Sequence, residues 1–142
     1  MHQSRITEDQ ENAIYAVEPR LWPAADDGQR LRLARGLEAG WYRIVLKLVS
    51  DLAEQAKQEN RGNDNYPEII ELKQKWGGLR IYIRSGSPKM QALVDAAEEE
   101  SESVCQECGE REDVSAYKDR GWIKSLCSGC QVLDALGKPE LD

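Results

Sequence analysis

Apolar residues recur at spacings of three and four in the segment that follows Leu37, which is the stripe of an amphipathic helix. The positions on this stripe are Trp41, Ile44, Val45, Leu48 and Leu52. Gly62, with asparagines on both sides, is a typical end for such a helix. We expect the stripe to face a hydrophobic core.

A second pattern surrounds Gly77-Gly78, where the sequence EIIELKQKWGGLRIYIR alternates between apolar and polar residues on both sides of the glycines. It predicts a β-hairpin with the two glycines as its turn. That turn would place Trp76 opposite Leu79, and Lys75 opposite Arg80. One side of the ribbon would then face the core. The other side would be basic, with the candidate binding residues Lys73, Lys75, Arg80, Tyr82 and Arg84.

The segment SPKMQALVDAAEEESES predicts a helix in which Ser87 is the N-cap and Pro88 the first helical residue. Met90, Leu93, Val94 and Ala97 would form its buried stripe. Carboxylates gather at its end, where the helix dipole disfavours them: Glu98, Glu99, Glu100 and Glu102. The basic ribbon and these acids are each unfavourable alone, so we expect them to face each other. The alternative is that the ribbon meets an acidic partner or a phosphate from outside the chain.

Two cysteine pairs follow, Cys105-x2-Cys108 and Cys127-x2-Cys130, with 18 residues between them. This spacing is typical of a four-cysteine zinc site. Gly109 follows the first pair, where a tight knuckle favours glycine. The intervening VSAYKDRGWIKSL predicts a hairpin, and SGCQVLDALG predicts a short helix that ends at Gly137. This is the order of a treble-clef-like finger.

The chemistry of the cysteines has three interpretations, namely a zinc site, a redox dithiol and extracellular disulfides. The chain starts with neither the basic segment nor the apolar run of a signal peptide, and it has no apolar stretch of membrane-spanning length. We therefore expect a cytoplasmic protein without a membrane partner, in which zinc is favoured over disulfides. The only histidine is His2, and four sulfurs fill a tetrahedral site, so the predicted Zn²⁺ is structural rather than catalytic.

These elements predict an α+β fold: an amphipathic helix packed on a β-hairpin, followed by a helix and a C-terminal treble-clef-like finger. With 142 residues, of which 40% are hydrophobic, the chain has room for one modest core. Residues 1–30 are polar and contain two prolines, so we expect a partly ordered N-terminal arm pinned by Tyr15, Leu21 and Trp22. Residues 31–104 would form the body and residues 105–142 the finger.

The motifs LKQKWGGLRIYI, CQECG and GWIKSLC together resemble a family of small, uncharacterised bacterial and phage-associated proteins. That family has a K-x-K-[FW]-G-G-L-R-[FIY]-Y hairpin, an upstream glycine-tryptophan pair, matched here by Gly40-Trp41, and a finger closed by G-W-x-[KR]-[ST]-L-C. The resemblance covers about residues 36–131. It implies the fold and the metal, and it supplies no activity.

The net charge of −7 argues against a general binder of phosphate backbones. We therefore expect a non-enzymatic, zinc-binding protein-interaction module. If the chain comes from a phage or mobile element, we expect it to act as an inhibitor or adaptor of a host protein or nucleoprotein complex. Its candidate partner-binding residues would include Glu98, Glu99 and Glu102. The alternative is a nucleic-acid binder that uses residues 73–84, because residues 61–84, with five basic and three acidic side chains, are the one basic segment. An enzyme is disfavoured because the chain has no internal histidine and no phosphate-binding glycine loop.

Overall fold

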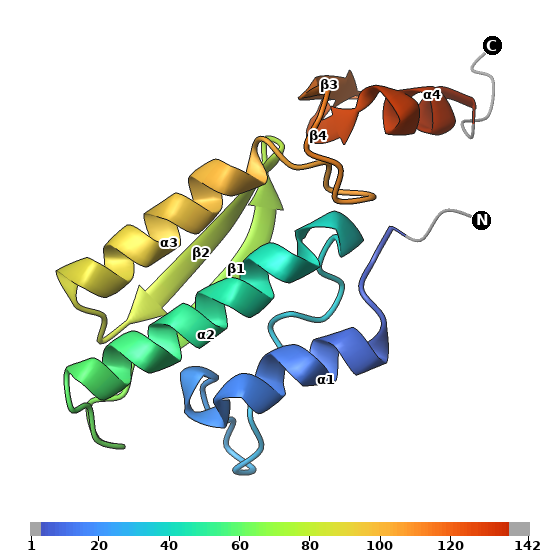
Figure 1. Cartoon of the computed structure of the whole chain (residues 1–142). Coiled ribbons are helices and arrows are strands. Elements are labelled where there is room, and N and C mark those ends of the chain that lie inside the picture. Colours follow the sequence, from blue (N-terminus) through green and yellow to red (C-terminus); the bar gives the residue numbers. More distant parts are fainter. Residues whose placement is uncertain (1–3, 137–142) are drawn as a thin grey trace.

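The computed structural model describes residues 4–136, apart from the side chain of Asp119, and has the predicted α+β architecture (Figure 1). Two helices lie along a two-stranded sheet, a third helix packs on one of them, and a second hairpin with a short helix forms the finger (Figure 1). In chain order the elements are α1 (Glu8–Val17), η1 (Pro19–Leu21), η2 (Ala39–Trp41), α2 (Tyr42–Gln58), β1 (Glu68–Lys75), β2 (Gly78–Arg84), α3 (Pro88–Ser101), β3 (Val114–Asp119), β4 (Trp122–Cys127) and α4 (Ser128–Leu136).

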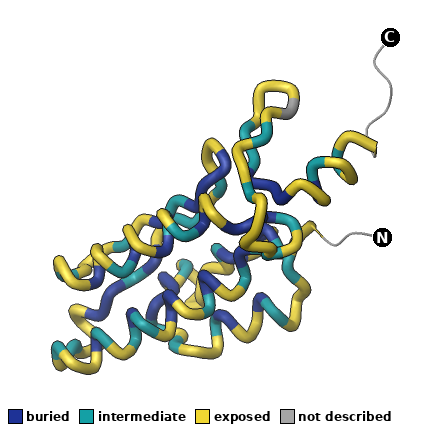
Figure 2. Tube along the Cα trace, turned by 45° about the horizontal axis from the view of Figure 1, so that its top comes forward, coloured by how far each residue is buried: buried dark blue, intermediate teal, exposed yellow. Residues whose placement is uncertain are grey.

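The predicted stripe of α2 is the centre of the core. Ile44, Val45, Leu48 and Leu52 are buried along it, and Trp41 is fully buried in the turn just before it. Figure 2 shows the buried positions gathered where the helices and the hairpin face one another. α2 begins at Tyr42 and ends at Gln58, before the predicted stop at Gly62.

The N-terminal segment belongs to this core. Leu21 and Trp22 are fully buried, and Tyr15 packs edge-on against Trp22 with 4.9 Å between the ring centroids. These are the three residues that were predicted to pin the segment to the body. Helix α1 was not predicted. It begins with a capping box in which the Thr7 hydroxyl accepts from the Gln10 amide at 3.1 Å and the Gln10 side chain accepts from the Thr7 amide at 2.9 Å.

The first hairpin forms, but its predicted turn and register were wrong. The two-residue turn is Trp76-Gly77, with φ of 53° and 78°, and Gly78 is already in β2 opposite Lys75. Arg80 therefore lies opposite Lys73 rather than Lys75. The shift moves the pairing by two residues, so the core side of the ribbon keeps its predicted residues except Trp76, which is exposed in the turn.

Helix α3 has the predicted cap: Pro88 is its first residue, and the Ser87 hydroxyl accepts from the Met90 amide at 3.2 Å. The helix also covers the outer edge of β2. The Leu79 amide donates to the Ser101 hydroxyl at 2.8 Å, and the Ile81 amide donates to the Glu98 carboxylate at 2.9 Å. Backbone groups that a β-edge would expose are satisfied in this way.

The finger follows the predicted order of knuckle, hairpin and helix. Strands β3 and β4 pair from Val114 opposite Cys127 to Asp119 opposite Trp122, around a turn at Arg120-Gly121. The predicted helix stop at Gly137 lies outside the described residues. Within residues 4–136, no helix combines the length and apolar character that crossing a membrane requires.

Candidate metal centre

The four cysteines come from three places in the finger and converge on one point. Cys105 and Cys108 flank the knuckle after α3, Cys127 ends β4, and Cys130 lies in the first turn of α4. Their sulfur atoms all lie within 4.8 Å of one another. All four are free thiols, and Sγ of Cys108 and Sγ of Cys127 are 3.7 Å apart.

This spacing fits a metal site. Four sulfurs placed tetrahedrally about 2.3 Å from a zinc ion would be about 3.8 Å from each other, whereas a disulfide requires about 2.05 Å. The arrangement could hold a metal ion, and its soft, all-thiolate donor set is of the kind that zinc takes in structural sites. With four sulfurs as ligands, no position would remain for a bound water.

The thiols differ in exposure and in acidity. Cys105, Cys127 and Cys130 are buried, whereas Cys108 is exposed. Desolvation of the sulfur atom within the cluster raises the pKa of Cys130 and also that of Cys108, although the Cys108 residue as a whole is exposed. Burial also acts to raise the pKa of Cys127, but hydrogen bonds, first from the Cys130 amide at 3.4 Å, outweigh it and lower the pKa of this thiol. A bound cation would favour the thiolate form of every cysteine in the cluster.

The knuckle has the predicted glycine, and backbone hydrogen bonds fix its shape. Gly109 has φ of 84°, and its amide donates to the Cys105 carbonyl at 2.9 Å. The Cys105 amide in turn donates to the Glu110 carbonyl at 2.8 Å. These bonds hold the first cysteine pair in a tight loop.

The body contacts the centre through the glycine-tryptophan pair before α2. The Gly40 amide donates to the Gln106 carbonyl at 2.8 Å, and Nε1 of Trp41 donates to the Ser101 carbonyl at 3.1 Å and the Val104 carbonyl at 3.3 Å. A Cβ atom at Gly40 would lie 1.9 Å from the Cys105 carbonyl oxygen. Glycine is therefore required at this contact, a role that the sequence pattern did not show.

The first hairpin contacts the same side of the finger. The Ser125 hydroxyl donates to the Gly77 carbonyl, and the Gln74 side-chain amide donates to the Ile123 carbonyl at 2.7 Å. A Cβ atom at Gly77 would lie 3.2 Å from the Lys124 carbonyl carbon. Gly77 thus serves both the turn and the close approach of two backbones, and only the first role was predicted.

The predicted basic side of the hairpin pairs mostly with carboxylates of this chain. Lys73 lies 2.7 Å from Glu71, and Arg84 pairs with Glu68 across the strands. Arg80 lies 3.7 Å from Glu102. The Lys75 ammonium lies over the Trp76 ring, 4.7 Å from its centroid, and the Tyr82 ring is 6.0 Å from the Lys73 ammonium and half exposed.

The acidic end of α3 meets the basic side at one ion pair, between Glu102 and Arg80. Glu98 uses its carboxylate on the Ile81 amide, and Glu99 is exposed. Glu100 instead pairs with Arg111 of the finger at 3.5 Å. The basic side of the hairpin and the acidic end of α3 were expected to face each other, but they meet only at this ion pair. Most of the hairpin cations pair instead with acidic residues of the hairpin itself.

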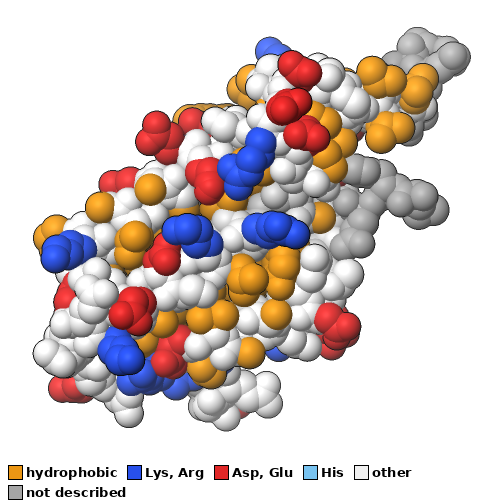
Figure 3. All heavy atoms as spheres, in the orientation of Figure 1, with side chains coloured by type: hydrophobic (Ala, Val, Ile, Leu, Met, Phe, Trp, Pro, Cys, Tyr) orange, Lys and Arg blue, Asp and Glu red, His pale blue; other side chains and the backbone are white. Residues whose placement is uncertain are grey.

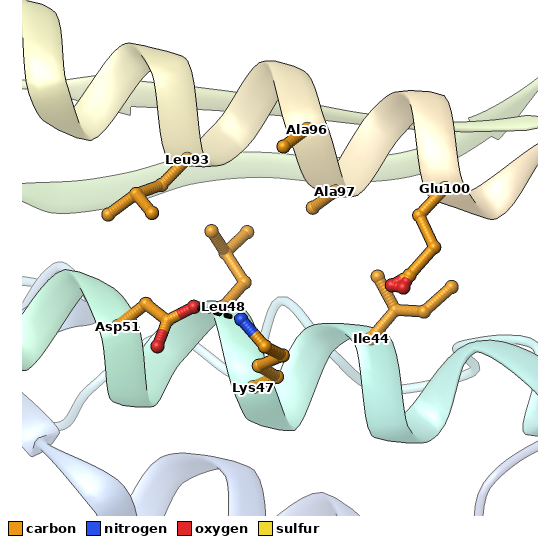
Figure 4. Close-up of a pocket in the computed structure, with 8 residues that line it drawn as sticks. All are labelled: Ile44, Lys47, Leu48, Asp51, Leu93, Ala96, Ala97 and Glu100. Atoms are coloured by element: carbon orange, nitrogen blue, oxygen red, sulfur yellow. Dashed lines mark hydrogen bonds and ion pairs between the residues drawn. The ribbon is translucent and has the colours of Figure 1, made fainter.

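The hollows of the surface either are small or contain charged side chains that pair with other residues of the chain. Between α2 and α3 lies a groove of about 90 Å³, with Leu48 and Ala97 in its floor and an ion pair of 2.6 Å between Lys47 and Asp51 on its rim (Figure 4). Sites for small molecules are commonly about 300–1,000 Å³. A larger hollow of about 480 Å³ contains Arg20 and Arg61, which are bonded to Glu18 and Glu59.

The most exposed of the large apolar side chains, which the sequence reasoning missed, lie on the finger and at the turn of the first hairpin. Trp76 and Trp122 are 68% and 66% exposed. Figure 3 shows apolar side chains gathered over α4, where the exposed residues are Val132, Leu133 and Leu136. The stripe of α4 could be read from its sequence, but its exposure depends on the absence of a packing partner among the described residues.

Comparison of the chain with protein-family models, with curated proteins and with solved structures gives no match.

Proposed function

We propose that this chain is a non-enzymatic protein-interaction module in which a structural zinc ion holds the finger against the helix-hairpin body. The observation that carries the proposal is the pairing of the hairpin cations with carboxylates of the same chain, at Lys73, Arg80 and Arg84. A nucleic acid would have to displace these carboxylates, whereas a protein surface can use the exposed aromatic rings beside them.

The all-sulfur ligand set supports a structural role for the metal. Zinc with four thiolates carries about two negative charges, which adds to the net charge of −7 and further disfavours a phosphate backbone. The same acidity supports a role as an inhibitor or adaptor, encoded by a phage or mobile element, that acts on a host protein or nucleoprotein complex. This last role rests on charge and on the resemblance of the motifs alone.

Metal analysis and capture from the native cell test the proposal together. Untagged protein should contain about one zinc ion per chain, and a Cys108→Ser variant should bind the ion more weakly. A captured partner should be a protein, retained after nuclease treatment and lost in the serine variant. Retention of oligonucleotides instead, with an affinity that falls steeply as salt is added and is lost when Lys75 and Arg80 become glutamate, would favour the nucleic-acid alternative.

A further inference from the structure

The outer edge of β1 has no strand beside it. The sheet contains only β1 and β2 among the described residues, and helix α3 covers the edge of β2. The amides of Leu79 and Ile81 point away from β1, toward Ser101 and Glu98. In an antiparallel ladder, both members of such a pair turn their backbone groups outward.

The residues opposite these two are Gln74 and Leu72. Each therefore turns one N–H and one C=O toward the outer edge of β1. The irregularity between Ile69 and Glu71 ends this regular edge on one side, and the contact of Gln74 with the finger ends it on the other. Between Leu72 and Gln74, the outer edge of β1 thus offers two hydrogen-bond donors and two hydrogen-bond acceptors.

A groove of about 210 Å³ runs along this edge, between β1 and the segment before η2. Its charged side chains are Arg5, Arg35, Lys73 and Glu38, three cations and one carboxylate. Glu38 is nearly buried and pairs with Arg5 at 3.2 Å. Arg35 lies 3.8 Å from Glu11, which does not line the groove, and the side chain of Arg35 is 71% exposed. Lys73 pairs with Glu71, so each of the three cations has a carboxylate partner in the chain, but the lining itself contains two more cations than carboxylates.

We propose that this edge binds an extended, acidic peptide segment of a partner protein, which adds to β1 as a third strand. This inference rests on the proposed function and names the chemistry of the partner. The alternation of outward N–H and C=O groups selects a peptide over a nucleic acid, because a phosphodiester backbone accepts hydrogen bonds and has none to donate to the carbonyls of Leu72 and Gln74. Because Arg35 is largely exposed and its ion pair with Glu11 is 3.8 Å long, an acidic side chain of the peptide can pair with Arg35 at little cost.

Selection from a random heptapeptide library displayed on phage, with the full zinc-loaded chain as bait, tests the inference. The enriched peptides should be acidic with alternating apolar residues. In amide NMR spectra of the protein, the best peptide should shift the signals of Leu72 and Gln74 most. The same peptide with N-methyl groups on alternate residues should lose binding, because it cannot donate to the strand.

Charge reversal supplies the matched control. Replacing Arg35 and Lys73 together by glutamate should weaken the best peptide at least about tenfold. Lys57→Glu and Lys89→Glu together, an equal change in charge on exposed residues of α2 and α3, should alter affinity less than about twofold. Comparable amide spectra of the unbound variants would show that each has kept its fold.

Three results would overturn the inference, and a fourth would separate its failure from that of the proposed function. Peptides whose signal shifts centre on α4, or whose affinity survives the double reversal, would refute the β1 site and leave an interaction module in place. A library that yields no binder would also refute it. If the chain in addition binds a fluorescein-labelled oligothymidylate with steep salt dependence, the proposed function fails as well.

Discussion

Gly40 and Cys105 are in such close contact that only a hydrogen atom fits between the α-carbon of one and the carbonyl oxygen of the other. The added Cβ would lie 1.9 Å from that oxygen and 2.7 Å from the Gly109 amide nitrogen. Both neighbours are backbone atoms of the cysteine knuckle, so no side-chain rotation can relieve the overlap. The contact joins the start of α2 to the candidate metal centre.

Gly40→Ala should therefore destabilise the protein by about 1–3 kcal/mol or more, because the knuckle has to move away from the body. Chemical denaturation measures the change in the free energy of unfolding. Gly129→Ala is the matched control, since Gly129 lies in α4 with open space around its α-carbon, and alanine should stabilise a helix there by up to about 1 kcal/mol. Equal effects of the two substitutions would contradict a specific contact at Gly40.

Removal of the metal should unfold the finger and leave the body folded. The finger's buried cluster consists of three cysteines and Leu126, whereas the body has its own core around Trp41 and Leu52. Without the metal, the finger lacks the apolar area to stay folded alone. In hydrogen exchange with a strong chelator, the amides of β3, β4 and α4 should lose protection, and those of α2 should keep it.

Two results would contradict this prediction. Unchanged protection of the finger in chelator would mean that the four sulfurs do not depend on a metal for their placement. Loss of protection throughout α2 would mean that the body and finger form one cooperative unit, held by the contacts at Gly40 and Gly77. Restoration of the protected state by added zinc would show that this ion can fill the site.

The elements that could be predicted from the sequence are those with strong local signals. The stripe of α2, the Ser87-Pro88 start of α3 and the spacing of the cysteines each depend on neighbouring residues alone. Helix α1 has a local signal at its start, the Thr7–Gln10 capping box, but it lacks an apolar stripe, because within Glu8–Val17 only Glu11 and Ile14 are buried. Glu11 is buried because Arg32 lies 3.1 Å from it, a distant partner that no local pattern shows.

The turn of the first hairpin shows why register was harder to predict. The glycine pair offered two placements, and the sequence favoured the one with glycine at both turn positions. A Cβ atom at Gly78 would lie 2.8 Å from Nη1 of Arg80 and 3.2 Å from the Glu102 carboxylate. The second glycine thus leaves room for a side chain and an ion pair, and Trp76 takes the left-handed turn position instead.

Ser87 should link stability to pH. Its hydroxyl donates to the Glu59 carboxylate at 2.7 Å, and this bond, with others from Gln55 and Arg61, lowers the pKa of Glu59 below its ordinary value of 4.5. A carboxyl whose pKa is lower in the folded state stabilises it above the unfolded pKa, and this stabilisation is lost as the pH falls through the folded pKa. Ser87→Ala should make unfolding less pH-dependent below about 4.5.

The same substitution removes the N-cap of α3, so at neutral pH it should also cost about 0.5–2 kcal/mol. Denaturation at a series of pH values separates the two effects. Ser50→Ala is the control, because the Ser50 hydroxyl is exposed on α2 and donates only to its own helix, at the Leu46 carbonyl. If the free energy of unfolding of Ser87→Ala falls with decreasing pH in parallel with that of the parent protein, the hydrogen bond from Ser87 to Glu59 does not have this role.

Ser101 should be more important to the hairpin than its size indicates. It is fully buried, and its hydroxyl accepts from the Leu79 amide on the edge of β2. Ser101→Ala leaves this buried amide without its partner, which should cost about 1–3 kcal/mol of unfolding free energy. Ser103→Ala, at an exposed position just after α3, should change stability by less than about 0.5 kcal/mol. Because α3 closes the β2 edge through this bond, faster exchange of the Leu79 amide should accompany the loss. Unchanged exchange would show that the helix covers the edge without it.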